Sequence, residues 1–194
     1  MKNEIVFDIE TQNTFQDVGG HNPSLLKVSV VGVYFYATGE FKTYFENELK
    51  DLWPLFEHAD RVIGYNIKGF DLPVLNNYYA GDLMKFPHLD LMDEIVKSTG
   101  FRIKLDDVAS ATTGEGKSGS GLAAVEYWRT GNLEKLKSYC LDDVRITRDV
   151  YEFGKKNGFL KYKDWLGKVA EVKVDFGAGQ LSSVKQPINL TMSL

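Results

Sequence analysis

The sequence predicts an α/β fold with one mixed β-sheet. Strand-forming runs rich in Val, Ile, Phe and Tyr recur between residues 5 and 92, and helical patterns separate the later runs from one another. From Asp93 to about Asn157 the chain reads mostly as helix, interrupted by clusters of Gly and Thr. Strands that alternate with helices in this way are typical of α/β architecture.

The first three strands are predicted before any helix. Residues 5–11, I-V-F-D-I-E-T, form an apolar run bounded by polar residues, which suits a strand covered on both faces. Residues 27–37 and 41–46 are two more strands, and they flank a T-G-E turn signal with Gly39 in the turn. A β-hairpin is therefore expected directly after the first strand.

Two helices and two further strands follow in alternation. Residues 48–59 have helical spacing, although Pro54 inside the segment favours a kink. A second helix, residues 71–80, has Pro73 in its first turn, where proline is tolerated. The strands are residues 61–66 and 86–92, which complete a sheet of five; residues 169–176 read as an added edge strand, and residues 180–194 fit no element.

Composition limits the class of protein. The 194 residues are 43% hydrophobic, which is enough for one sizeable core, so residues 1–194 are expected to form a single domain. The net charge of -4 speaks against coating nucleic acid by bulk electrostatics, but it allows a local basic groove. Neither a membrane span nor a secretory leader is recognisable. Together with a single cysteine, Cys140, this predicts a cytoplasmic protein without an internal disulfide.

Two carboxylates lie in the middle of the first predicted strand. Asp8 and Glu10 are two residues apart, so their side chains point to the same side of the strand. Two like charges in a buried site repel each other, and leaving them uncompensated costs several kcal/mol. The sequence therefore predicts positive charge between them.

Two more carboxylates are candidates for the same site. Asp71 stands at or near the start of a helix, where the ordinary interpretation is an N-cap. In the last long helix, Asp142 and Asp149 point away from the core on the helical wheel, whereas Asp143 lies at the edge of the core stripe, one turn after Tyr139. That stripe consists of Leu136, Cys140, Val144, Thr147 and Tyr151.

These residues resemble the three exonuclease motifs of the DEDD superfamily, in the subtype with Tyr before the last Asp. The motifs are D-I-E-T from Asp8, N-x-x-x-F-D from Asn66 to Asp71, and Y-x-x-x-D from Tyr139 to Asp143. The second is similar to that of family B DNA polymerase proofreading domains and of stand-alone or helicase-linked predicted exonucleases. The resemblance covers roughly residues 3–155, and leaves residues 165–194 as a C-terminal extension. It implies a ribonuclease H-like fold, a mixed five-stranded sheet with helices on both faces.

The resemblance also implies the chemistry. Four carboxylates from three distant segments would hold two Mg²⁺ or Mn²⁺ ions about 4 Å apart, which would supply the missing positive charge. Asp8 would bridge both ions, Glu10 and Asp143 would hold the ion carrying the attacking water, and Asp71 would support the other. Tyr139 would orient the water or act as its base; a phenol pKa near 10 favours orientation.

Substrate contacts are implied for Thr11, Asn66 and Phe70 within the motifs. One departure concerns the first motif, where T-Q replaces the threonine-glycine often found there and a long loop follows to Pro23. This departure affects how a substrate enters, and leaves the four acids in place.

Several other features have two interpretations. Residues 111–118, A-T-T-G-E-G-K-S, match a loose phosphate-binding loop, but a helix is predicted before them instead of a strand, so a loop near the last long helix is favoured. Lys117 in this loop is a candidate phosphate contact. Asp90 is a secondary site residue or an N-cap. Residues 154–168 place lysines among aromatics, which is typical of a single-strand groove or, as favoured here, of a solvated face with its aromatics in the core. His21, His58 and His88 are scattered without metal-ligand spacing.

The function expected from the sequence is a metal-dependent 3'-5' exonuclease acting on single-stranded ends, with DNA preferred. The alternatives on the same fold are an exoribonuclease or a structure-selective endonuclease. A non-catalytic nucleic-acid-binding module is the alternative from another class. The family resemblance suggests a helicase or polymerase as a protein partner.

Overall fold

The central sheet has five strands in the order β3-β2-β1-β4-β5. Strand β1 pairs antiparallel with β2 and parallel with β4; β2 pairs antiparallel with β3, and β4 parallel with β5. The computed structural model describes residues 3–116 and 121–177. The bounds are β1 Glu4–Thr11, β2 Val28–Phe35, β3 Glu40–Phe45, β4 Arg61–Gly64 and β5 His88–Asp90. The predicted mixed sheet is therefore confirmed.

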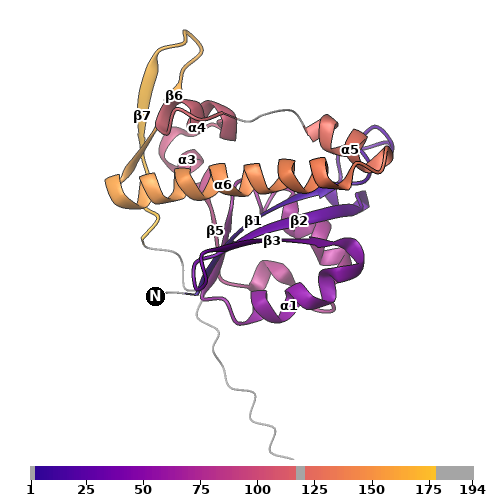
Figure 1. The fold of residues 1–194 in the computed structure, drawn as a ribbon. Coiled ribbons are helices and arrows are strands. Elements are labelled where there is room, and N and C mark those ends of the chain that lie inside the picture. Colours follow the sequence, from indigo (N-terminus) through magenta and orange to yellow (C-terminus); the bar gives the residue numbers. More distant parts are fainter. Residues whose placement is uncertain (1–2, 117–120, 178–194) are drawn as a thin grey trace, which may run out of the picture.

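Helices cover both faces of this sheet (Figure 1). Helix α6, Leu133–Asn157, packs on β1 and β2 on one face, where Val6 and Val144 share a buried cluster. On the other face, α1 (Leu49–Glu57) and α2 (Asp71–Leu75) pack in a cluster that contains Phe7. Side chains of β1 alternate between the two faces, as the period of a strand requires.

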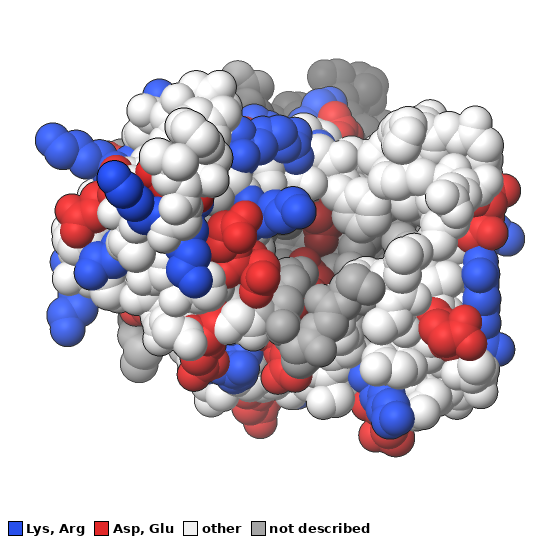
Figure 2. All heavy atoms as spheres, turned by 90° about the horizontal axis from the view of Figure 1, so that it is seen from above, with Lys and Arg blue, Asp and Glu red and all other residues white. Residues whose placement is uncertain are grey.

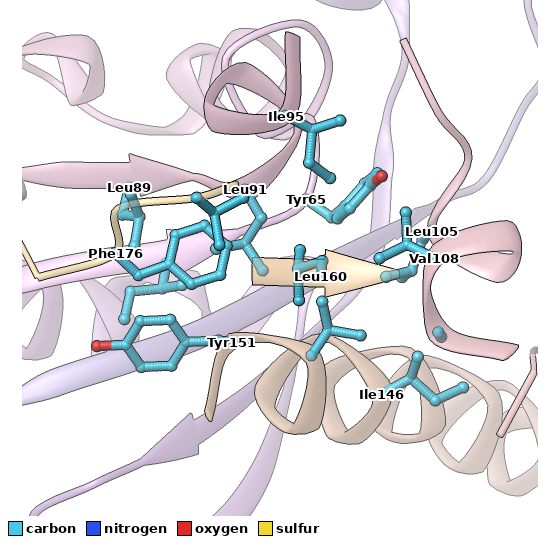
Figure 3. Packing of buried hydrophobic residues seen from close by; sticks show 14 of the residues in the cluster. Tyr65, Leu89, Leu91, Ile95, Leu105, Val108, Ile146, Tyr151, Leu160 and Phe176 are labelled. Atoms are coloured by element: carbon cyan, nitrogen blue, oxygen red, sulfur yellow. The ribbon is translucent and has the colours of Figure 1, made fainter. Parts of the chain in front are cut away.

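Three further α-helices and a second sheet belong to the described part of the chain. Helices α3 (Leu91–Thr99), α4 (Leu105–Thr112) and α5 (Gly121–Arg129) lie between β5 and α6 along the chain. Figure 3 shows that the buried cluster containing Val6 and Val144 joins α6 to α3 and α4 through Ile95, Leu105 and Ile146. Among the described residues, no helix is both long and apolar enough to cross a membrane.

Residues 169–176 contain a strand, as predicted, but the prediction that it adds an edge to the central sheet is wrong. Strand β7, Val169–Lys173, pairs antiparallel with β6, Phe159–Lys163, in a separate two-stranded sheet. Gly158, with φ 75°, ends α6 in the left-handed conformation, and β6 begins directly after it. The nearest partner for β7 is thus its neighbour along the chain. The unplaced residues 180–194 lie outside the described residues.

The two prolines have different outcomes. Helix α1 runs through Pro54 as a single element and buries Leu52 and Phe56. Helix α2 contains Pro73 in its first turn, as expected, but it ends at Leu75 and continues as a 3-10 turn, Asn76–Tyr78. The predicted helix over residues 71–80 is therefore shorter than its sequence pattern indicates.

A buried ion pair fixes α6 to the start of β1. The Arg61 guanidinium donates to Glu4 Oε1 at 2.7 Å and to the Tyr151 hydroxyl at 2.6 Å, and Tyr151 donates to Glu4 Oε2 at 2.9 Å. Arg61 also donates to the Phe176 carbonyl at 2.9 Å, which anchors the chain after β7. Because each buried charge has a hydrogen-bonded partner, the network holds α6 in one position relative to β1.

Candidate metal centre

Strand β1 presents Asp8 and Glu10 toward α6. Ile5, Phe7 and Ile9 belong to the cluster on the opposite face, so the even-numbered side chains face the helix. Glu10 is buried and Asp8 is half-buried. The register of the pairing between β1 and β2 shifts directly after this, between Glu10 and Thr11. The strand therefore places both carboxylates on one face, as predicted.

Helix α6 approaches the sheet closely beside Asp8. Gly32 is the register partner of Asp8 on β2, and a Cβ atom at Gly32 would lie 2.9 Å from the Cys140 sulfur and 3.0 Å from Val144 Cγ2. Only glycine leaves room for this contact. The core stripe predicted on the helical wheel is buried at all five positions, Leu136, Cys140, Val144, Thr147 and Tyr151.

The close packing brings Asp143 to the carboxylates of β1. One carboxylate oxygen from each of Asp8, Glu10 and Asp143 lies within 4.8 Å of the other two. Asp143 is 2% exposed, whereas Asp142 and Asp149 are half-exposed and pair with Arg145 at 3.8 and 3.7 Å. The assignment of Asp143 as the inward carboxylate is confirmed.

Asp71 lines the same cleft as the three carboxylates. It is 3% exposed and is the first residue of α2, after Phe70 at the N-cap position, so the ordinary interpretation of Asp71 as an N-cap does not hold. Burial, and then the charge of Asp8, hold the pKa of Asp71 well above its usual range. The two acids are therefore electrostatically coupled, although they come from different elements.

The acids line a cleft of about 430 Å³. Tyr139, on α6 one turn before Asp143, is buried at its wall, and Thr11, Asn66 and Phe70 line it as well. Lys117 lies outside the described residues. Figure 2 shows the hollow in the middle of one face, with acidic side chains inside it.

Asp90 positions the segment that carries Asn66. Its carboxylate accepts from the backbone N–H groups of Asn66 at 2.7 Å, Lys68 at 3.0 Å and Met92 at 3.0 Å. It is thus the N-cap of α3, one of its two predicted interpretations, and it also supports Asn66, which has φ 64°. Burial raises the pKa of Asp90.

Sequence reasoning missed the residues that form the far walls of the cleft. Phe15, in the loop after β1, packs against Phe70 with ring centroids 6.0 Å apart, and Leu122 and Val125 contribute from α5. Arg129 at the end of α5 bonds Asp17 at 2.7 Å and so joins the two walls. The only available signal was the unusual length of the loop.

The remaining sequence candidates that the structure describes do not line the cleft. The segment before residues 113–116 is helix α4, so the strand that a phosphate-binding loop requires is absent from this described part of the chain. His21, His58 and His88 are not among the lining residues of the cleft.

Three carboxylate oxygens at this separation suit a hard divalent cation, because Mg²⁺ and Mn²⁺ prefer oxygen ligands. The acids come from β1 and α6, and the packing of α6 on β1 sets their separation. The cluster is consistent with divalent metal binding.

Comparisons with known proteins agree with this arrangement. The family B DNA polymerase of the hyperthermophilic archaeon Pyrobaculum calidifontis is similar in structure, with a TM-score of 0.59 and 21% sequence identity. The match covers 79% of this chain and 24% of the polymerase chain, so this chain spans about a quarter of that protein's length. No protein among the curated sequences matches this one. A family model of the RNase_H superfamily, RNase_H_2, matches residues 5–153, and the chain therefore belongs to the RNase_H superfamily.

Proposed function

We propose that the protein is a metal-dependent 3'-5' exonuclease that hydrolyses phosphodiester bonds at single-stranded nucleic acid ends, with DNA preferred. The observation that carries this proposal is the cluster of Asp8, Glu10 and Asp143 within 4.8 Å, in a cleft that also contains Asp71. A superfamily with nucleases among its members and a fold similar to part of a family B DNA polymerase support it. One catalytic domain would extend over residues 1–194.

The four acids would hold two Mg²⁺ or Mn²⁺ ions. When bound, these ions would supply charge stabilisation at the phosphate and lower the pKa of the attacking water. The chain's own part is to fix the carboxylate oxygens. Asp8 and Glu10 are fixed by the register of β1, Asp143 by the packing of α6 against Gly32, and Asp71 by its position at the start of α2.

Tyr139 would orient the attacking water. It lies at the wall of the cleft, one helical turn from Asp143, which places its ring on the same side of α6 as that acid. The ordinary pKa of a phenol, near 10, favours a hydrogen-bonding group over a general base in this position.

The terminal nucleotide would be held by the cleft walls. Phe70 and Phe15 offer aromatic faces for stacking a base, and the Asn66 amide offers donors and acceptors. The Thr11 hydroxyl donates to the Asn13 carbonyl at 2.9 Å, which shapes the loop beside the acids. Lys117 as a phosphate contact stays a prediction.

Three alternatives are separated by their products. An exoribonuclease would prefer RNA, an endonuclease would release internal fragments, and a binding module would release nothing. Burial of Glu10, Asp71 and Asp143 disfavours a module, because buried carboxylates are costly to retain without a cation. A cytoplasmic location, which agrees with the single cysteine, and a helicase or polymerase partner are further parts of the proposal.

The test is incubation with 5'-labelled single-stranded DNA and RNA in Mg²⁺, in Mn²⁺ and in EDTA. The proposal expects a ladder that shortens from the 3' end with DNA, release of nucleoside monophosphates, and no product in EDTA. Binding without any product in either metal would contradict it, as would cleavage that begins at internal positions.

A further inference from the structure

The turn between β6 and β7 exposes an aromatic side chain. Trp165 is 90% exposed, so the prediction that the aromatics of residues 154–168 lie in the core is wrong for this residue, while Phe159 and Tyr162 are half-buried. The turn is held by Asp164, whose carboxylate accepts from the backbone N–H groups of Leu166 at 2.9 Å and Lys168 at 2.8 Å. A fixed turn that presents a large apolar surface is typical of a binding site.

Trp165 forms one side of a groove with both aromatic and basic residues. The groove has a volume of about 650 Å³, and its other side is the segment before α4, including Phe101, which is 50% exposed. Phe101 and Tyr162 contact edge to face, with ring centroids 6.1 Å apart. The exposed cations Arg102, Lys104 and Lys163 line the groove, together with Asp107 and Asp164.

The groove is connected to the cleft of the metal centre by two hydrogen bonds. Arg102 donates to the side-chain oxygen of Asn66, and the Tyr65 hydroxyl donates to the Ile103 carbonyl at 2.6 Å. Both Tyr65 and Asn66 line the cleft, whereas Arg102 and Ile103 line the groove. Figure 2 shows basic side chains, with acidic ones beside them, next to the acidic hollow on this face.

We propose that this groove binds the single strand a few nucleotides 5' of the end held in the cleft, with Trp165 and Phe101 as stacking platforms. The inference rests on the proposed function, since it names the path of that function's substrate. Aromatic side chains stack bases of any sequence, and cations beside them contact the phosphates. A duplex offers no free base faces, so the groove should select single strands.

The test measures binding in EDTA, where no hydrolysis occurs. A labelled oligothymidylate of about 12 nucleotides, within the size range of single-strand sites, is titrated with wild type, Trp165→Ala and Trp165→Phe. Trp165→Ala should weaken binding about tenfold, from the loss of one stacked base, and Trp165→Phe should restore part of it. Leu166→Ala is the matched control, because Leu166 is 58% exposed in the same turn but does not line the groove.

A second measurement tests the cations. Lys163→Gln should reduce the slope of log affinity against log salt concentration by about 0.7, the value for one phosphate contact on a single strand. Lys168→Gln, in the same hairpin but outside the groove, should leave the slope unchanged.

Unchanged oligonucleotide binding in Trp165→Ala would overturn the proposal, and so would equal affinity for duplex and single strand. Loss of self-association in Trp165→Ala with intact binding would also overturn it and assign the turn to a protein interface. None of these results depends on catalysis, so they are distinct from a failure to detect exonuclease products.

Discussion

The Cys140 thiol of α6 donates to the backbone carbonyl of Asp8 on β1, with the sulfur 3.6 Å from the oxygen. This contact fixes the helix that carries Asp143 directly over the strand that carries Asp8 and Glu10. It requires Gly32 on β2, because any larger residue would meet the sulfur first. The separation of the three carboxylates therefore depends on a glycine that is not itself part of the cluster.

Substitution of Gly32 should consequently affect stability and the site together. Gly32→Ala overpacks the contact with Cys140 and Val144 and should lower the free energy of unfolding by about 1–3 kcal/mol. Gly20→Ala, where nothing lies within 4 Å of the new methyl group and φ is not positive, is the matched control. Urea unfolding measures both.

Removing the sulfur should relieve part of the strain. The double variant Gly32→Ala/Cys140→Ala should lose less stability than the sum of the losses in the two single variants, because the new methyl group then occupies space left by the thiol. Strict additivity, or a Gly32→Ala variant as stable as wild type, would show that α6 is not held against β2 as described.

Tyr139→Phe should reduce turnover without weakening metal binding, because it removes only the hydroxyl that we propose orients the attacking water. The measurement is kcat together with the Mg²⁺ concentration that gives half-maximal activity. A lower kcat at an unchanged Mg²⁺ midpoint is expected. A shifted midpoint with normal kcat would make Tyr139 a structural part of the metal site instead.

Divalent metal should stabilise the folded protein. The proposed ions would bind only the folded arrangement of the acids, so Mg²⁺ at 100 times its dissociation constant should add about 2.7 kcal/mol for one site. Thermal unfolding in EDTA and in millimolar Mg²⁺ measures this gain. Asp71→Asn, which removes one of the acids, should gain less. A wild type indifferent to Mg²⁺ and Mn²⁺ would contradict a preformed site.

The stability of Asp71→Asn relative to wild type should depend on pH in EDTA. The pKa of Asp71 is raised in the folded protein, first by burial, so the unfolded chain loses this proton before the folded one does. Stability contributed at this position falls as pH rises from about 3.9 toward the raised value. Asp71→Asn has no carboxyl group at this position, so it does not undergo this loss of stability. The gain in its free energy of unfolding over that of wild type should be small at about pH 4 and larger near neutral pH. An advantage independent of pH would contradict the burial effect.

The sheet and the inward acids could be predicted because their signals are local. Alternating side chains on residues 5–11 place Asp8 and Glu10 on one face, and the helical wheel separates Asp143 from Asp142 without any knowledge of the partner surface. The convergence of these segments with Asp71 required the family resemblance, because spacing alone does not bring distant segments together.

The walls of the cleft and the groove could not be predicted in this way. The helical periodicity predicts a mostly helical stretch from Asp93 to Asn157. It does not predict that α5 and the loop containing Phe15 enclose the acids. The mixed charge run around Trp165 predicts a solvated lysine face with its aromatics in the core. The exposure of Trp165 depends instead on the pairing of β6 with β7, which places this residue in the turn between them. Such pairings are settled by tertiary packing.

The most direct test of the metal centre compares Asp143→Asn with Asp142→Asn in the exonuclease assay. The two acids are neighbours on α6, but only Asp143 is buried beside Asp8 and Glu10, whereas Asp142 is half-exposed next to Arg145. Asp143→Asn should abolish cleavage of the labelled single strand, and Asp142→Asn should keep most of it. Equal loss from both, or full activity in Asp143→Asn, would contradict the assignment of the acids on β1 and α6 as the metal-holding site.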